Sequence, residues 1–146
     1  MALGEFDLKR IAEIREEVRR FGVEELLTAE EVEAARPEEG TCLLFVNTHD
    51  ECAADLARPA LAVALQHDRI PAKVYSVFAG QELDATARAR AYFKDTFPTA
   101  PQIGLLVEGR LAYMCDRDDM QKRLRNPDKI ADELTAAFDE HCPEAD

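Results

Sequence analysis

From Thr41 onward the chain alternates short apolar segments with helix-forming segments, and this order limits the available folds more than any other feature. The apolar run Cys42–Val46 is followed by a polar turn and then by an Ala- and Leu-rich segment that reaches Gln66. Short apolar runs bounded by turn residues are typical of buried strands. The sequence therefore predicts, in order, strand Thr41–Asn47, helix Cys52–Gln66, strand Ala72–Phe78, helix Asp84–Lys94, strands Gln102–Val107 and Arg110–Cys115, and a last helix from Pro127.

The predicted element order is β-α-β-α-β-β-α, which is the order of the thioredoxin fold. The first three strands alternate with helices, so right-handed parallel crossovers are expected between them. Glu108-Gly109 is a tight-turn signal, so the last two strands should form an antiparallel hairpin. The fold class is therefore α/β, thioredoxin-like, with a mixed sheet covered by helices on both faces.

The first forty residues precede this order and carry their own helical signals. Apolar residues recur at helical spacing from Asp7 to Phe21, and a capping-box pattern at Thr28 begins a second, short helix. About 35 residues cannot hold a core alone. We therefore expect one thioredoxin-like domain over residues 1–146, with residues 1–40 as a helical extension packed on it.

The charge and hydropathy of the chain limit the classes of partner that it can bind and the cellular location that it can have. The 146 residues include 30 acidic and 18 basic side chains, which gives a net charge of −12. This excess argues against nucleic acid or an anionic membrane as a partner. The N-terminal residues resemble no signal peptide, and no apolar run approaches the roughly 18 residues of a membrane helix. A cytoplasmic location is expected.

Four cysteines, Cys42, Cys52, Cys115 and Cys142, carry the nucleophilic chemistry that the sequence offers. Their spacing contains no Cys-x-x-Cys and fits no zinc site, so neither a metal nor a cofactor is expected. Cys42 and Cys115 lie in apolar strand segments and should be buried. Cys142 lies near the C-terminus and should be exposed; it could serve as a distant resolving thiol if it reaches Cys52.

Several segments along nearly the whole chain resemble the bacilliredoxin family. The matching segments are Thr28–Ala35, Leu44–Asn47, Ala53–Ala54, Ala57–Ala60, Val77–Gln81, Ala85–Phe93, Pro98–Pro101 and Ala137–Cys142. The resemblance implies a thioredoxin-like protein that exchanges thiols and disulfides and removes bacillithiol from mixed disulfides on protein cysteines. Its partners would be protein thiols, or mixed disulfides with a low-molecular-weight thiol. Oligomeric state is not indicated.

The resemblance also locates the expected site and shows where this chain departs from the family. The family carries Cys-Gly-Cys after its first strand, and this motif falls on Asp50-Glu51-Cys52. Asp50 thus stands in place of the attacking cysteine, and Cys52 in place of the second. Two further departures are Asp55, where the family has Gly, and Arg117–Gln121, where it has Arg-His-x-Ile-Glu. The resemblance implies that Pro101 is cis and faces Cys52, and that substrate binds at Pro101, Ala100, Asn47 and Thr48.

A carboxylate cannot replace an attacking thiolate, because disulfide exchange needs a sulfur that forms a mixed disulfide and leaves again. Cys52 could act alone, at a helix N-terminus that favours its thiolate by about 1 kcal/mol. The charges of Asp50 and Glu51 oppose this, each by roughly 2 to 3 kcal/mol at an effective dielectric near 20. We therefore expect a mostly protonated, slow thiol. A structural interpretation of the same residues is that Thr48–Glu51 form a capping box and the two acids stabilise the first helical turn.

Two functions remain open from the sequence. The first is a bacilliredoxin-like thiol–disulfide exchange protein with a degenerate site, which has at most a weak single-thiol activity through Cys52. The second is a non-enzymatic thioredoxin-like binding module that uses the same face. The rate of Cys52 alkylation as a function of pH discriminates between them.

Overall fold

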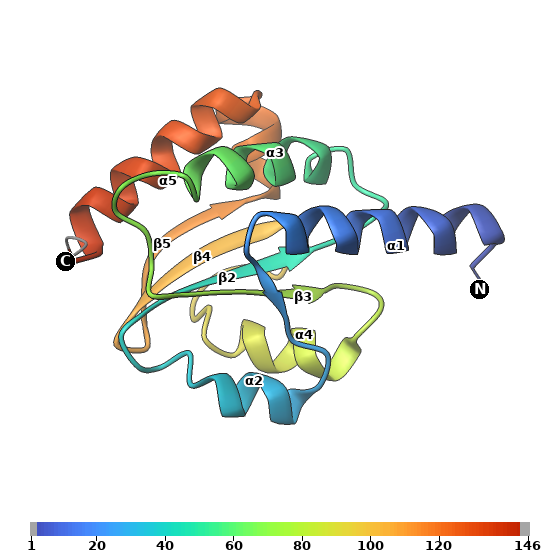
Figure 1. Cartoon of the computed structure of the whole chain (residues 1–146), viewed down its shortest axis with the longest axis horizontal. Helices are drawn as coiled ribbons and strands as arrows, with labels where there is room; N and C mark the ends of the chain where they lie inside the picture. The colour runs from blue at the N-terminus through green and yellow to red at the C-terminus, as the bar shows by residue number, and fades with distance from the viewer. Residues whose placement is uncertain (1–2, 144–146) are drawn as a thin grey trace.

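The computed structural model, which describes residues 3–143, has a five-stranded sheet with strand order β1-β3-β2-β4-β5 (Figure 1). The strands are β1 (Glu24–Glu25), β2 (Thr41–Asn47), β3 (Lys73–Phe78), β4 (Gln102–Val107) and β5 (Arg110–Asp116). The helices are α1 (Glu5–Arg20), α2 (Ala29–Ala35), α3 (Ala54–Ala64), α4 (Leu83–Arg90), the π-helix η1 (Asp119–Leu124) and α5 (Pro127–His141). The predicted thioredoxin-like architecture is thereby present.

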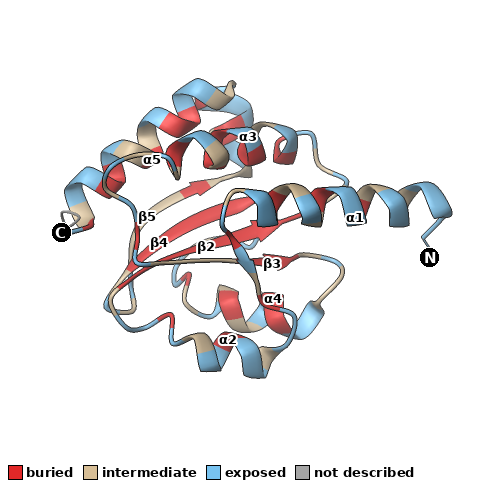
Figure 2. Ribbon diagram, in the orientation of Figure 1, coloured by how far each residue is buried: buried red, intermediate tan, exposed pale blue. Residues whose placement is uncertain are grey.

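Helices cover both faces of the sheet, as predicted (Figure 1). α3 and α5 lie on one face, where Leu43 and Phe45 of β2 join their core. α2 and α4 lie on the other face, where Leu44 and Val46 of β2 join a second core. Successive strand residues point to opposite faces, which explains why β2 is buried along its whole length and reads as a continuous apolar run (Figure 2).

The strand directions correct one expectation. β2 and β3 are parallel, and β4 and β5 form the predicted antiparallel hairpin. β4 runs antiparallel to β2, so the expectation that it would be a third parallel strand was wrong. α4 has only eight residues. The segment 91–101 then returns the chain to the end of the sheet at which β3 finished, and β4 starts there. The C-terminal ends of β2 and β3 and the N-terminal end of β4 therefore lie together at one end of the sheet.

Element boundaries also differ from the prediction where helices were expected to be longer. α3 covers Ala54–Ala64 rather than Cys52–Gln66, and α4 ends at Arg90 rather than Lys94. β1 and η1 were not predicted, because a two-residue strand and a single π-helical segment have no periodicity to detect.

The first forty residues are joined to the sheet by a strand as well as by helices. β1 pairs with β3 at the sheet edge. Val18 of α1 lies in the core shared with α3 and α5, while Ile11 and Ile14 cluster with Phe78 at the end of β3. Within residues 3–143, no helix combines the length and the apolar character needed to cross a lipid bilayer.

Candidate functional site

The candidate site lies on the turn that follows β2 and leads into α3. Of the four cysteines, all within the described residues, only Cys52 is exposed, and it lies in this turn. Asp50 is also exposed, whereas Asn47 and Thr48 before it are buried. The turn therefore exposes one thiol and one carboxylate to solvent, while the two residues that precede them are buried.

The start of α3 corrects two expectations about Cys52. The helix begins at Ala54 with Ala53 as its N-cap, so Cys52 precedes the first helical turn instead of lying in it. The expected capping box is absent: the Thr48 hydroxyl donates to Asp50 Oδ1 at 3.0 Å, and α3 has no side-chain cap. A tight turn, in which the Ala54 and Asp55 amides donate to the carbonyls of Glu51 and Cys52, occupies the residues where the helix was expected.

Both carboxylates next to Cys52 have partners. The Arg117 guanidinium, at the end of β5, donates to Glu51 Oε1 at 3.3 Å, and Asp50 accepts the hydrogen bond from Thr48. From the sequence, Glu51 was expected to be an uncompensated charge. Its pairing with Arg117 was not predicted, because a contact between residues so far apart in the chain leaves no local pattern.

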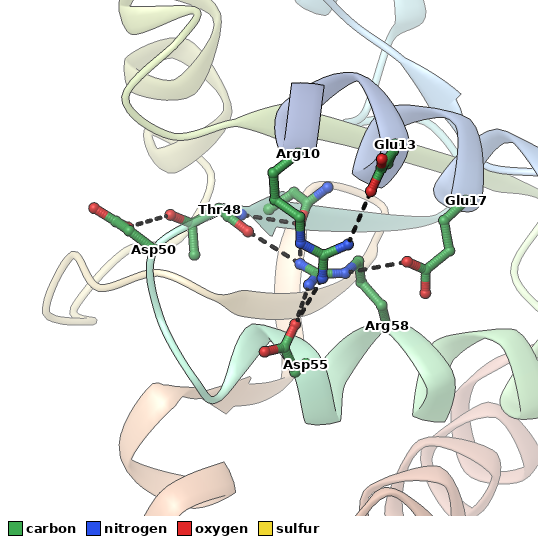
Figure 3. A network of polar contacts seen from close by, with 8 residues as sticks. Arg10, Glu13, Glu17, Thr48, Asp50, Asp55 and Arg58 are labelled. Carbon is green, nitrogen blue, oxygen red and sulfur yellow. Dashed lines mark hydrogen bonds and ion pairs between the residues drawn. The ribbon is translucent and has the colours of Figure 1, made fainter. Parts of the chain in front are cut away.

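A buried arginine, Arg58, holds the base of the turn from the second turn of α3 (Figure 3). Its Nη1 donates to Asn47 Oδ1 at 3.1 Å and to the Thr48 carbonyl at 3.0 Å. Its Nη2 donates to Asp55 Oδ1 at 2.5 Å, and its Nε lies 3.6 Å from Glu17 Oε1 of α1. Burial lowers the pKa of Arg58, and the charges of Glu17 and Asp55 oppose this shift. An arginine remains charged under such conditions.

A second loop, at the same end of the sheet as the turn after β2, contains the cis peptide Ala100–Pro101, which confirms the predicted isomer. Arg90 holds the loop by donating to the Thr99 carbonyl at 2.6 Å and to Gln102 Oε1 at 3.1 Å. Gln102, the next residue, pairs with Val46 near the end of β2. The cis peptide thus lies at the same end of the sheet as the turn that carries Cys52. That Pro101 faces Cys52 stays a prediction.

An open groove of about 540 Å³ runs beside Asp50. Thr48, His49 and Asp50 line it together with Leu3 and the turn Ala79–Gln81 after β3. Gly80 has a φ of +87°, a conformation that glycine adopts without steric cost. His49 Nδ1 is buried and has no hydrogen-bond partner among the described residues. Across residues 3–143, no three His, Cys, Asp or Glu side chains come together as a set of metal ligands.

Comparison with known proteins identifies the family. A family model described as "Disulphide isomerase" matches residues 6–142. A bacilliredoxin of Koribacter versatilis is 45% identical over 130 residues, which cover 88% of each chain. A bacilliredoxin of Shouchella clausii is 39% identical over 97% of each chain. The chain belongs to the bacilliredoxin family.

The fold of this bacilliredoxin is also that of thioredoxins. A solved mutant thioredoxin from Halobacterium salinarum superposes with a TM-score of 0.58 at 9% identity, over 86% of this chain and 96% of that one. Family and fold together support a role in thiol–disulfide redox chemistry. The segments that match the family include Arg58, which holds the turn, and Ala79–Gln81, which line the groove.

None of the other three cysteines of this bacilliredoxin is exposed. Cys42 and Cys115 are buried, as predicted, and burial raises the pKa of each thiol to about 12. Cys142 is buried too, so its expected exposure was wrong. It ends α5 and its thiol interacts with Thr41 at the start of β2, whereas Cys52 lies beyond the end of β2. A seven-residue strand is about 20 Å long, so Cys142 is out of reach as a resolving thiol.

Proposed function

We propose that this bacilliredoxin is a thiol–disulfide exchange protein with a degenerate site, whose remaining activity is weak and depends on Cys52 alone. The observation that carries the proposal is the exposure of Cys52, the single accessible thiol, in the turn after β2. Asp50 occupies the position at which the family resemblance expects the attacking cysteine. Because Asp50 offers no sulfur, the two-cysteine mechanism is not available.

A single-thiol reaction balances as an exchange between three sulfurs. The Cys52 thiolate attacks one sulfur of a mixed disulfide, a new S–S bond forms to Cys52, and the other thiolate leaves and takes up a proton. The product is Cys52 in a mixed disulfide. An external low-molecular-weight thiol must then attack it, because Cys142 and the two strand cysteines are buried.

The substrates we propose are protein thiols and their mixed disulfides with a low-molecular-weight thiol such as bacillithiol. Pro101, Ala100, Asn47 and Thr48 are proposed to contribute to the binding surface. Since Asn47 and Thr48 are buried, their contribution comes through the backbone shape of the turn. The net charge of −12 disfavours nucleic acid and anionic membranes as partners, and we propose that the protein acts in the cytoplasm.

A second candidate function is a non-enzymatic binding module that uses the same face. The groove beside Asp50 favours it, because His49 lines this groove and its buried Nδ1 has no hydrogen-bond partner within residues 3–143. A polar group of a bound peptide or small thiol would satisfy that nitrogen.

The decisive experiment incubates the protein with a bacillithiol mixed disulfide on a substrate protein and follows the products by mass spectrometry. The exchange proposal predicts slow appearance of a Cys52 adduct in the wild type, none in Cys52→Ser, and much faster turnover in Asp50→Cys. Cys142→Ser is the matched control and should equal the wild type. Binding without any Cys52 adduct would support the second function, while equal rates for wild type and Asp50→Cys would refute the claim of a degenerate site.

A further inference from the structure

We propose that Arg58 is a positioning residue: its guanidinium fixes the turn between β2 and α3, and with it the direction in which positions 50 and 52 face a substrate or partner. This inference rests on the proposed function only in taking that turn as the site. It concerns a residue that does not line the groove and whose hydrogen bonds go to Asn47, Thr48 and Asp55 rather than to Cys52 or Asp50.

The contacts of Arg58 are directed at the backbone and base of the turn. One nitrogen, Nη1, bridges Asn47 Oδ1 and the Thr48 carbonyl, at 3.1 and 3.0 Å. The same Asn47 oxygen accepts the Thr48 amide at 2.9 Å, and the Thr48 hydroxyl donates onward to Asp50. A chain of hydrogen bonds therefore runs from Arg58 through Asn47 and Thr48 to Asp50 (Figure 3).

The burial of Arg58 argues for a geometric role. The residue is only 1% exposed, and taking a charge out of water costs several kcal/mol unless its partners compensate. An apolar side chain would fill the same space without that cost. A guanidinium differs from it in its rigid, planar set of donors, which fixes the orientation of the groups that it binds.

The N-terminal extension completes the charge balance around Arg58. Glu17 of α1 lies 3.6 Å from Arg58 Nε, a buried atom that makes no hydrogen bond among the described residues. Arg10 of α1 lies 3.3 Å from Asp55, which Arg58 also binds (Figure 3). α1 therefore supports the turn indirectly: Glu17 offsets the charge of Arg58, and Arg10 binds the Asp55 carboxylate that Arg58 also binds.

Amide hydrogen exchange of the full chain tests this inference without requiring any activity. In Arg58→Lys, the amides of residues 48–52 should exchange at least tenfold faster than in the wild type, because the fork of donors is lost. A purely structural role would instead accelerate the β4 amides, which exchange through global unfolding, and leave residues 48–52 unchanged. Arg88→Lys, at an arginine on α4 that pairs with Glu33, is the matched control and should change neither set.

Two further variants keep the test decisive. Asn47→Ala removes the oxygen shared by Arg58 and Thr48, so it should also accelerate exchange at residues 48–52, and it decides the question if Arg58→Lys does not fold. Glu17→Gln keeps the bonds to the turn and should change exchange there less than threefold. The inference is overturned if residues 48–52 exchange within twofold of wild type in every folded variant at positions 47 and 58. Absence of thiol exchange even in Asp50→Cys would contradict the proposed function alone.

Discussion

The Arg117 guanidinium lies 3.3 Å from Glu51 Oε1, across 66 residues of chain, and so compensates a carboxylate adjacent to the exposed thiol of Cys52. An unpaired carboxylate disfavours a neighbouring thiolate, which is the species that alkylates. Arg117→Gln should therefore slow the reaction of Cys52 with iodoacetamide at pH 8 about two- to threefold. Arg110→Gln, at the other end of β5, is the charge-matched control and should react at the wild-type rate. Equal rates for the two variants would show that this ion pair is irrelevant to the thiol.

Replacing Asp50 with Asn should have the opposite effect on the same reaction. The change removes one negative charge beside Cys52, so alkylation should become faster. Asn keeps an oxygen that can accept the Thr48 hydroxyl, and the side chain at position 50 is exposed. The free energy of unfolding should accordingly fall by about 0.5 kcal/mol or less. A larger loss in urea unfolding would indicate that Asp50 has a structural role beyond this hydrogen bond.

The buried thiol of Cys42 should make stability depend on alkaline pH. Burial raises the pKa of Cys42 to about 12, whereas a thiol in the unfolded chain has a pKa of about 8.5. Above that lower value the unfolded chain releases the proton and the folded chain keeps it, so stability is present below pH 8.5 and is lost as the pH rises toward 12. The loss approaches about 1.4 kcal/mol per pH unit.

Cys42→Ala isolates this contribution. Its free energy of unfolding should lie below the wild-type value at pH 7.5, and the difference should shrink or reverse at pH 10, because the variant lacks the thiol that ionises on unfolding. Urea unfolding under reducing conditions at both pH values measures it. A difference that stays constant between the two pH values would contradict the assignment.

The ion network around Arg15 should stabilise the attachment of α1. Arg15 is largely buried, pairs with Glu25 of β1 and, at 2.6 Å, with Glu82 before α4, and stacks 4.7 Å from the centre of the Phe78 ring. Arg15→Met leaves Glu82 without this partner, whereas Glu25 keeps Arg19 at 2.7 Å, and should cost about 1–3 kcal/mol in urea unfolding. Adding Glu82→Gln should recover most of that loss. No recovery would mean that packing, rather than charge, explains the effect.

The sequence predicted those parts of the fold that depend on local pattern. The apolar run of β2, the tight turn at Glu108-Gly109 and the capping Thr28 each correspond to an observed element, because periodicity, turn chemistry and capping act over a few residues. The direction of β4 was missed. It depends on the path of segment 91–101, which local pattern does not specify.

The candidate site was predicted in position but not in its support. Cys52 and Asp50 were identified from the family motif, and the cis isomer at Pro101 followed from the same resemblance. The roles of Arg58 and Arg117 depend on contacts between distant segments, and Cys142 was misplaced because closeness to a terminus says nothing about docking against β2. The sequence signal that could have pointed to Arg58 is a charged residue inside the Ala- and Leu-rich segment that follows the motif.

The distribution of the cysteines determines what oxidation can produce. Cys42 and Cys115 belong to cores on opposite faces of the sheet, and Cys142 lies at the opposite end of β2 from Cys52. All three of these thiols are buried, so Cys52 is the one cysteine that a disulfide from solution reaches in the folded chain. A disulfide that Cys52 forms with an accessible sulfur is therefore shared with a second molecule, and the mass added to the oxidised protein identifies the molecule that supplied that sulfur.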